Sequence, residues 1–471
     1  FLCFTLFFSL SISKPLLLPL THSLSKTQFA TTHHLLKFIS TRSTTRFLNR
    51  HHRNRQVSLP LSPGSDYTLS FTLGTHPPHP TISLYLDTGS DLVWFPCQPF
   101  ECILCEGKPG FSDSSSASPK LSSSAISVPC QSHFCSGAHS SLPTSDLCAI
   151  AKCPLDSIET SDCNSFNCPP FYYAYGDGSL IAKLHRDSLS LNSLILHNFT
   201  FGCAHTALAE PIGVAGFGRG ILSLPAQIGS VNPQLGSRFS YCLVSHSFDS
   251  DKIRSPSPLI LGRYNDKQKR PSSDGDEFVY TQMLDNPKHP YFYSVGLEGI
   301  SVGKRNIPSP SMLKGVDRKG NGGMVVDSGT TFTMLPASLY DSVVAEFDRR
   351  VGRVYERASH VEETTGLAPC YYYDMVVSVP NVALHFVGNG SSVVLPRRNY
   401  FYEFFDGGDK KRNVGCLMLM NGGDDEDLSG GPGATLGNYQ QQGFEVVYDL
   451  EEKRVGFARR RCASLWDSLN Q

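Results

Sequence analysis

The chain has 471 residues, of which 41 are basic and 42 acidic, giving a formal net charge of −1. This length exceeds that of one ordinary domain and predicts two lobes, while the composition is that of a globular protein. The charge is unevenly distributed, because eight basic residues precede the first acidic one, Asp66; without them, 33 basic residues face 42 acidic ones. Such an acidic body argues against nucleic acid and anionic membranes as partners.

The N-terminus is apolar. Phe1–Ile12 is typical of the hydrophobic region of a secretory signal peptide that lacks its start, and we assign residues 1–20 to an N-terminally incomplete signal peptide. No later run of 18 apolar residues exists, so we expect no membrane span in the mature chain. Fifteen cysteines indicate an oxidising compartment. We therefore predict a secreted, extracellular protein, with the vacuole as the alternative destination.

Residues 21–56 are rich in Ser, Thr, His and Arg. They are either a solvated basic tail or a basic pro-segment held by acidic groups of the body, the catalytic carboxylates proposed below included. In the second case low pH protonates those carboxylates, weakens the attraction and releases the segment. The sequence does not indicate which cation is responsible. The eight basic residues before Asp66 are Lys14, Lys26, Lys37, Arg42, Arg46, Arg50, Arg53 and Arg55.

Strand-like segments begin after residue 57. Tyr67–Leu73 alternates apolar and polar residues, and Ile82–Leu86 leads into Asp87. A carboxylate at the end of a buried strand needs hydrogen-bond donors, since desolvation otherwise favours its protonated form. The turn that follows supplies two hydroxyls and a glycine that lets backbone N–H groups approach: Thr88, Gly89 and Ser90.

Nine cysteines lie between residues 97 and 168, in an irregularly spaced, Ser-rich stretch. The pair Cys102 and Cys105 raises the possibility of a zinc or redox site, but a secreted chain favours an insertion held by disulfides, with no metal. Because nine is odd, at least one of them pairs outside the insertion. The disulfide candidates are Cys97, Cys102, Cys105, Cys130, Cys135, Cys148, Cys153, Cys163, Cys168, Cys203, Cys242, Cys370, Cys416 and Cys462.

The next motif is a hairpin over residues 172–179, in which a Gly-Asp-Gly turn follows aromatic residues. It is either a structural hairpin or a flap that closes over a substrate. The Gly-rich stretch over residues 213–220 only superficially resembles a phosphate-binding loop, since no matching helix follows. Asn198 and Asn389 begin glycosylation sequons.

The first acidic turn has a counterpart far along the chain. The apolar segment Met324–Val326 precedes Asp327, followed by Ser328, Gly329 and Thr330. Either Asp alone is consistent with a turn that merely closes a hairpin. Two copies, each behind an apolar strand, instead favour a paired site. Ala337–Val351 is the best helix candidate in an otherwise all-β pattern.

The repeated order resembles the pepsin-like aspartic proteases, in details closest to the plant nepenthesin-type branch without a saposin-like insert. The matching segments are Asp-Thr-Gly-Ser, Tyr-Gly-Asp-Gly, Val214–Gly216, Asp-Ser-Gly-Thr and Leu436–Gln442. The resemblance implies an all-β, bilobal fold with a pseudo-twofold axis and a central cleft. We then expect an N-terminal lobe at 57–262 with its Cys-rich insertion at 97–168, an interlobe connection at 263–276 and a C-terminal lobe at 277–471.

By this resemblance, Asp87 and Asp327 are the catalytic pair. Two carboxylates about 3 Å apart share a proton, so one activates a water and the other protonates the scissile carbonyl oxygen. Thr88 and Ser328 would brace the two loops, and Ser90 and Thr330 would bind the outer carboxylate oxygens. Tyr175 would be the flap tyrosine and hydrogen-bond Trp94, while Gly176 and Asp177 would bind substrate backbone; plain core packing is the other interpretation of Trp94.

The predicted function is that of a secreted, monomeric aspartic endopeptidase that cleaves polypeptides at acidic pH, is blocked by pepstatin-type inhibitors and needs no cofactor. Two alternatives remain. Some plant proteins of this fold have lost catalytic residues and act as glycosidase inhibitors or binders, but here both Asp motifs are intact. A carboxylate-pair glycosidase is the other, and the Asp-Thr-Gly duplication argues against it.

Overall fold

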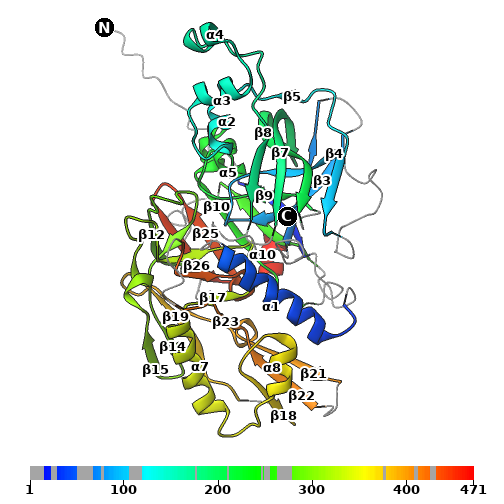
Figure 1. Cartoon of the computed structure of the whole chain (residues 1–471). Helices are drawn as coiled ribbons and strands as arrows, with labels where there is room; N and C mark the ends of the chain where they lie inside the picture. Colours follow the sequence, from blue (N-terminus) through cyan, green and yellow to red (C-terminus); the bar gives the residue numbers. More distant parts are fainter. Residues whose placement is uncertain are drawn as a thin grey trace, which may run out of the picture.

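The computed structural model describes residues 15–22, 29–49, 67–75, 79–105, 119–175, 178–208, 212–245, 248, 255–262, 278–374, 378–407, 412–424 and 431–470. Two β-rich halves lie one above the other in Figure 1, with helix α1 lying across the region between them. The all-β prediction is confirmed. The proposed connection at 263–276 and signal-peptide residues 1–14 fall outside the described residues.

Asp87, the first residue of the predicted pair, stands at the end of a strand in the N-terminal half. Strand β2 (Tyr67–Leu73) pairs antiparallel with β3 (Thr81–Asp87), whose last four residues are all buried. Strand β9 (Val214–Gly216) then runs parallel to β3, which places Gly216 beside Asp87. The other strands of this half are β4 (Trp94–Ile103), β5 (Ile126–Ser127), β6 (Phe171–Ala174), β7 (Ser179–Leu191) and β8 (Leu194–Leu208).

The C-terminal half repeats this arrangement around the second Asp. Strand β16 (Met324–Val326) runs parallel to β24 (Ala434–Leu436) and ends immediately before Asp327. The predicted helix is present as α7 (Ala337–Val351). The remaining strands are β13 (Ser294–Val295), β14 (Leu297–Val302), β15 (Arg305–Pro308), β17 (Thr333–Leu335), β18 (Cys370–Tyr373), β19 (Val382–Phe386), β20 (Ser392–Val394), β21 (Phe401–Asp406), β22 (Arg412–Leu417) and β23 (Leu419–Asn421).

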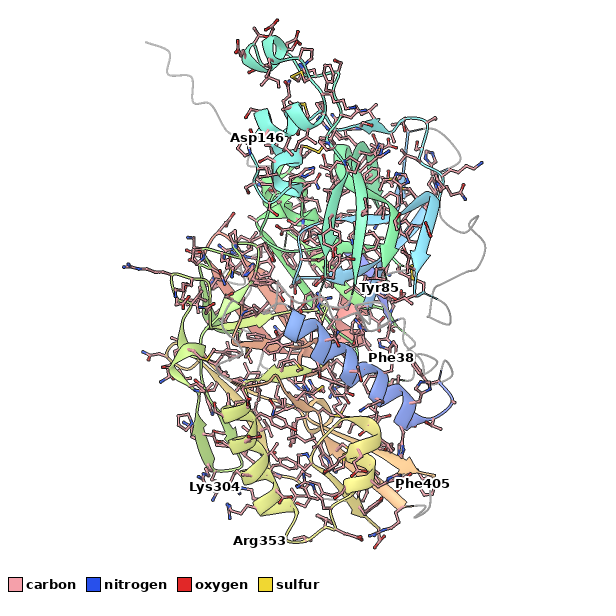
Figure 2. All side chains as sticks on the ribbon, viewed as in Figure 1. Phe38, Tyr85, Asp146, Lys304, Arg353 and Phe405 are labelled. Carbon is pink, nitrogen blue, oxygen red and sulfur yellow. A yellow bond between two sulfur atoms is a disulfide. The ribbon has the colours of Figure 1, made fainter. Side chains whose placement is uncertain are left out.

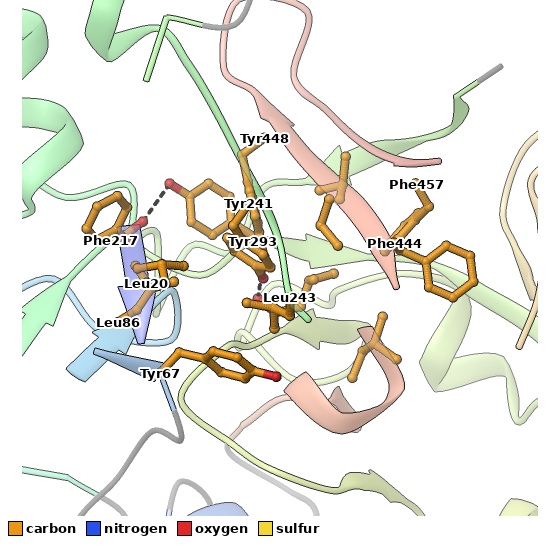
Figure 3. Close-up of a cluster of buried hydrophobic side chains, with 14 of the residues drawn as sticks. Leu20, Tyr67, Leu86, Phe217, Tyr241, Leu243, Tyr293, Phe444, Tyr448 and Phe457 are labelled. Carbon is orange, nitrogen blue, oxygen red and sulfur yellow. Dashed lines mark hydrogen bonds between the residues drawn. The ribbon is translucent and has the colours of Figure 1, made fainter. Parts of the chain in front are cut away.

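An antiparallel sheet joins the two halves. Its strands, in spatial order, are β1 (Leu16–His22), β11 (Ser257–Leu261), β10 (Arg238–Cys242), β25 (Phe444–Asp449), β26 (Arg454–Arg459) and β12 (Val279–Leu284). Strands β10 and β25 are buried along their whole length. Their aromatic side chains, together with Tyr293 from the C-terminal half, form the cluster drawn in Figure 3. This sheet therefore ties both acidic turns to one core.

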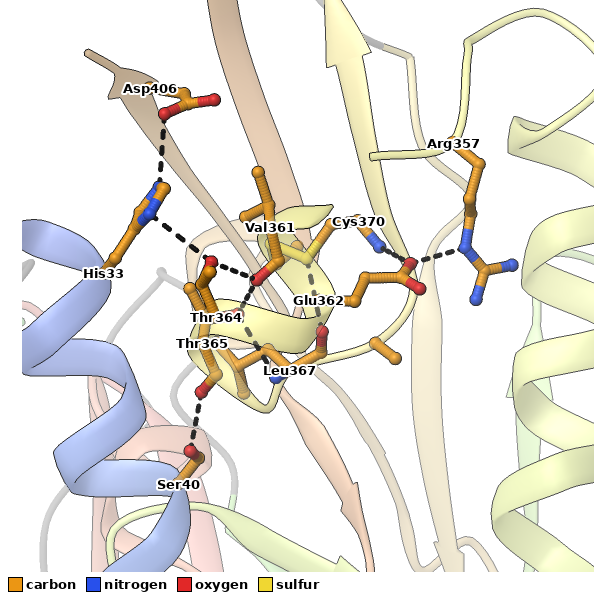
Figure 4. Close-up of a disulfide and its surroundings, with 12 residues drawn as sticks. His33, Ser40, Arg357, Val361, Glu362, Thr364, Thr365, Leu367, Cys370 and Asp406 are labelled. Atoms are coloured by element: carbon orange, nitrogen blue, oxygen red, sulfur yellow. Dashed lines mark hydrogen bonds and ion pairs between the residues drawn. A yellow bond between two sulfur atoms is a disulfide. The ribbon is translucent and has the colours of Figure 1, made fainter. Parts of the chain in front are cut away.

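Strand β1 and helix α1 (Thr32–Asn49) come from the part of the chain assigned to signal peptide and pro-segment. Strand β1 crosses the expected boundary at residue 20. Helix α1 buries Leu35, Leu36 and Ile39 in a cluster of the C-terminal half. Its polar side faces α8 (Ser359–Thr365), where the Ser40 hydroxyl donates to a backbone carbonyl of α8 (2.7 Å; Figure 4). Predicted boundaries 1–20 and 21–56 stay predictions.

All fourteen candidate cysteines form disulfides. The insertion contributes the odd partner as expected, because Cys97 pairs with Cys203 on β8. Cys102 and Cys105 bond to each other, so their sulfurs are not free to hold a metal. The other pairs are Cys130–Cys148, Cys135–Cys168, Cys153–Cys163, Cys242–Cys462 and Cys370–Cys416.

Residues 133–159 of the insertion contain three short helices that project from the end of the N-terminal half (Figure 1). They are α2 (His133–Ala138), α3 (Thr144–Ile150) and α4 (Leu155–Glu159). Figure 2 places Asp146 of α3 far from Phe38 of α1. The other helices are α5 (Leu224–Val231), α6 (Pro233–Gly236), α9 (Asn438–Gln441) and α10 (Cys462–Leu469). Among the described helices, none has both the length and the apolar character needed to cross a membrane.

Candidate active site

The turn after β3 holds the carboxylate of Asp87 with two local donors. The Gly89 N–H donates to Oδ1 (2.9 Å), and the Ser90 hydroxyl donates to Oδ2 (2.6 Å). The side chain is almost completely buried. Because a buried carboxylate is costly without donors, this turn supplies the hydrogen bonds that an aspartate at the end of a core strand requires.

The turn after β16 repeats the same contacts around Asp327. The Gly329 N–H donates to Oδ1 (2.8 Å), and the Thr330 hydroxyl donates to Oδ2 (2.5 Å). Asp327 is also fully buried. Two turns 240 residues apart thus present their carboxylates with equivalent donors on equivalent oxygens.

The two turns meet through reciprocal hydrogen bonds. The Thr88 N–H donates to Oγ of Ser328 (3.0 Å), and the Ser328 N–H donates to Oγ1 of Thr88 (2.9 Å). Each hydroxyl then donates across the interface to a backbone carbonyl of the opposite β-strand, both at 3.0 Å. A Cβ on Gly329 would lie 2.2 Å from Oδ1 of Asp87, so only glycine allows this approach. These bonds bring both carboxylates to one place.

A cation from helix α1 contacts both carboxylates. Nη2 of Arg46 lies 2.7 Å from Oδ1 of Asp87, and its Nε lies 3.5 Å from Oδ2 of Asp327. The Arg46 side chain is 4% exposed. The helix is fixed beside the site by Ser43, whose hydroxyl accepts from the Phe332 N–H (3.2 Å). Three of the eight basic residues considered from the sequence, Lys37, Arg42 and Arg46, lie among the described residues, and Arg46 pairs with both acidic turns.

The expected hydrogen bond of the flap is present. Nε1 of Trp94 donates to the hydroxyl of Tyr175 (2.6 Å), and burial raises the pKa of that hydroxyl well above its usual value. Tyr175 lies at the end of the β6–β7 hairpin, where its N–H donates to the Gly178 carbonyl (2.7 Å). Gly176 and Asp177 fall outside the described residues. Trp94 is completely buried, so it serves both the core and the flap.

A buried polar layer behind the turns was not anticipated. The side-chain amide of Gln441 donates to the backbone carbonyls of Asp327 (3.3 Å) and Leu436 (2.9 Å). Its oxygen accepts from the Tyr241 hydroxyl (2.5 Å), which also contacts the hydroxyl of Tyr448 (2.7 Å). These residues come from β10, α9 and β25, whose proximity no local pattern reveals. The layer supports the second turn from both halves of the chain.

The two sequon asparagines lie at the surface, where each side chain is exposed. Asn198 adopts a left-handed backbone conformation (φ 57°) within β8, and Asn389 lies in the turn between β19 and β20. Exposure is compatible with modification, and glycosylation of both residues stays a prediction.

Two family models match the chain. The model described as xylanase inhibitor N-terminal matches residues 67–263, and that described as xylanase inhibitor C-terminal matches residues 292–459. A probable aspartyl protease of Arabidopsis thaliana is 64% identical over 98% of this chain and 95% of its own length. Aspartic proteinase nepenthesin-1 of Nepenthes gracilis is 29% identical over 85% of this chain and 78% of its own.

Solved structures show the same fold at low identity. The crystal structure titled edgp aligns with a TM-score of 0.61 at 18% identity, covering 96% of each chain. Basic 7S globulin from soybean aligns with a TM-score of 0.59 at 19% identity, covering 86% of this chain and 98% of its own. The fold and the paired acidic turns thus define a pepsin-like protein, and the chain belongs to the plant pepsin-like aspartic protease family.

Proposed function

We propose that the protein is an aspartic endopeptidase produced as a zymogen, in which Arg46 neutralises the catalytic pair. The observation that carries this proposal is the mirrored arrangement of Asp87 and Asp327, each with a backbone and a hydroxyl donor, with one arginine touching both. An aspartate that only closes a turn does not require a second, equivalent carboxylate beside it or a cation shared by both.

Once Arg46 has left, a water molecule takes its place between the carboxylates. The ionised Asp removes a proton from this water as its oxygen attacks the scissile carbonyl carbon, and the protonated Asp donates its proton to the carbonyl oxygen. The tetrahedral diol then collapses: the Asp that took the water's proton gives a proton to the nitrogen as the C–N bond breaks, and the other Asp accepts a proton from a hydroxyl of the diol. Both carboxylates have returned to one shared proton when the products depart, so no covalent intermediate forms.

Acid activates the proposed zymogen by weakening the contact with Arg46. At neutral pH the carboxylates attract the guanidinium, and because arginine stays charged, only protonation of the acids removes the attraction. The acidic medium that releases helix α1 also gives the pair its shared proton. Disulfides throughout the described chain support secretion, and the extracellular space is the proposed destination.

A binding protein without catalytic activity is the second candidate. It is favoured by the description of the two matching family models as xylanase inhibitor domains. Against it stand the complete donor sets of both turns and the Trp94–Tyr175 hydrogen bond, which an inactive relative would not need to keep.

The test is hydrolysis of an acid-denatured protein by the secreted, acid-treated chain over pH 2 to 8, with and without pepstatin. We expect acid-dependent cleavage that pepstatin abolishes. In Asp87→Asn, cleavage should fall by at least about 10³-fold, because an amide neither accepts the water's proton nor shares one. Asp146→Asn, on the distant insertion, is the matched control and should cleave like wild type. Absence of cleavage by folded wild-type protein freed of residues 15–49 would favour the binding protein.

A further inference from the structure

One glycine-rich segment next to the catalytic pair has no role in the chemistry described so far. We define it as the 216–220 loop, which follows β9. It is bonded to the Asp87 turn at two backbone positions: the Phe217 N–H donates to the Asp87 carbonyl and the Gly218 N–H to the Ser90 carbonyl, both at 2.8 Å. The loop therefore moves with the first catalytic turn.

The same loop encloses the carboxyl group of Asp91. The Gly220 N–H donates to Oδ1 of Asp91 (2.8 Å). A Cβ on Gly218 would lie 2.4 Å from Oδ1, and one on Gly220 would lie 1.7 Å from Oδ2. Neither glycine has a left-handed backbone. At Gly220 the space taken by Asp91 alone forbids a side chain, whereas at Gly218 the backbone carbonyls of Ser90 and Tyr291 are also close. The glycine pattern of the sequence thus reflects a carboxyl group of the protein itself.

The far side of the loop is bonded to the C-terminal half. The Arg219 N–H donates to the Tyr291 carbonyl (2.9 Å), and the Arg219 guanidinium pairs with Asp285 (3.1 Å). The Tyr293 hydroxyl donates to the Phe217 carbonyl (2.8 Å), a bond drawn in Figure 3. Three contacts from one short segment therefore cross between the halves.

These contacts continue to the second catalytic turn. The Tyr293 carbonyl accepts from the Val326 N–H (3.0 Å), and Val326 directly precedes Asp327. A hydrogen-bonded path thus runs from the Asp87 carbonyl through Phe217 and Tyr293 to the residue before Asp327. The path reaches Val326 at its N–H, whereas the Thr88 hydroxyl reaches the carbonyl of the same residue.

We infer that Asp91 is a positioning residue, whose carboxyl group fastens the 216–220 loop to the Asp87 turn and so fixes Asp87 relative to Asp327. This inference rests on the proposed function, because it assigns a role in setting the geometry of that catalytic pair. Asp91 itself touches neither substrate nor water in this role. Its effect is to hold one reactive carboxyl group at the correct distance from the other.

The surroundings of Asp91 favour its neutral form. Burial raises its pKa to about 7, against the lowering effect of the Gly220 N–H, and the nearby charge of Asp87 raises it further. The other groups near this carboxyl are the hydroxyls of Tyr173 and Tyr293, and the Arg219 guanidinium is paired with Asp285. At the acidic pH of the proposed reaction, Asp91 therefore fastens the loop without adding a second negative charge beside Asp87.

Kinetics of the acid-activated full chain test the positioning role. Asp91→Ala removes the acceptor of the Gly220 N–H, and we expect kcat to fall about 10- to 100-fold with KM changed less than about 3-fold. Asp91→Asn keeps an acceptor oxygen and should stay within about 3-fold of wild type. Gly220→Ala should lower kcat strongly in the wild-type background and much less in the Asp91→Ala background, where the carboxyl oxygen that clashes with the new methyl group is gone. Wild-type kcat in Asp91→Ala, or additive effects in the double variant, would overturn the inference.

Thermal unfolding gives a readout that is independent of activity. A raised pKa in the folded state means that stability is fully present below the ordinary value of 3.8 and is lost as pH rises toward about 7. Because Asn does not titrate, the melting temperature of Asp91→Asn should fall less than that of wild type as pH rises from 4 to 7. Identical losses would refute the inference. If wild type cleaves nothing, the proposed function fails, and these melting curves alone decide about Asp91.

Discussion

At the scale of single residues, the site depends on hydroxyl groups that serve two partners at once. Thr88 Oγ1 accepts from the Ser328 N–H and donates to the Val326 carbonyl, in a completely buried position. Tyr448 adds a longer contact to the same oxygen (3.4 Å). Replacing this hydroxyl by a methyl group keeps the shape of the side chain and removes every one of these bonds.

We therefore expect Thr88→Val to lower the free energy of unfolding by about 2 to 4 kcal/mol, because a buried N–H and a buried carbonyl lose their partner. Cleavage should fall roughly 10-fold or more, since, of the bonds described between the two turns, only those made by Ser328 Oγ remain. Denaturant unfolding and cleavage assays at the activating pH measure both effects. Thr72→Val, on the partly exposed side of β2, should change stability by less than about 0.5 kcal/mol. Equal effects of the two substitutions would contradict this reasoning.

The residues of both turns were predictable because each motif is local. An apolar strand followed by Asp, a hydroxyl residue, Gly and a second hydroxyl residue places the carboxylate and its donors within four positions, as at Asp87 and Asp327. Arg46 and Asp91 carry no such signature, since their partners lie on other elements. The glycines of the 216–220 loop were visible in the sequence, but the group that requires them was not.

At the scale of elements, helix α1 binds the C-terminal half more than the N-terminal one. Its apolar side packs in a cluster of that half, and His33 at its start lies 3.4 Å from Asp406. Figure 4 shows His33 and Ser40 facing α8 from the same helix. Arg46 near the other end provides the contact with Asp87 of the N-terminal half. The helix thus contacts the pair of carboxylates through Arg46, near its C-terminal end.

In Arg46→Ala, cleavage activity should appear at higher pH and in a shorter time than in wild type. The reason is that the carboxylates no longer need protonation to lose their attraction for α1. Folding stability at neutral pH should also fall, because two buried carboxylates remain without their cation. Product formation and chain shortening, followed after stepwise acidification, measure the effect. Lys37→Ala changes an exposed residue of the same helix and should be activated at the same pH as wild type. An identical activation pH in the Arg46→Ala and Lys37→Ala variants would contradict the proposal that Arg46 blocks the catalytic pair.

At the scale of the whole molecule, two carboxyl groups are expected to limit stability from opposite sides of the pH range. The guanidinium groups of Arg349 and Arg350 lower the pKa of Glu346 to about 2. Its stabilising effect is therefore present above the ordinary value of 4.5 and is lost as pH falls through about 2. Asp91 acts in the opposite direction, since its raised pKa makes stability decline toward pH 7. The contributions of these two groups, taken alone, are both present between about pH 4 and 5.

Glu346→Gln should flatten the acid side of this profile. The amide does not titrate, so the melting temperature should fall less between pH 5 and 2 than in wild type, although it starts lower at pH 5 because the ion pairs are gone. Calorimetry at four or five pH values measures both quantities. Glu363→Gln, at an exposed position of α8, serves as control and should follow the wild-type curve. A parallel shift of the whole curve in Glu346→Gln would exclude the titration as the cause.

The sequence predicted the bounds of individual helices and strands, but it did not predict which distant strands pair with one another. The bounds of β2 and α7 agree with the expected segments, because alternating and helical periodicities are local properties. Strand β1 was not anticipated, since its apolar residues fit a signal peptide equally well. Its partner β11 lies more than 200 residues later, and no local pattern specifies such a pairing.

The sheet that joins the halves has a consequence for biosynthesis. Strand β10 pairs with β25 along its full length, from Arg238 with Asp449 to Cys242 with Glu445. While the ribosome is still translating the residues between them, the edge of β10 that will face β25 has no partner, although its other edge can already pair with β11. The nascent N-terminal half must therefore wait for the C-terminal strands, and Cys242 remains a free thiol until Cys462 emerges. In the secretory pathway that we propose for this chain, chaperones and disulfide isomerases would have the longest access at the seam between its halves.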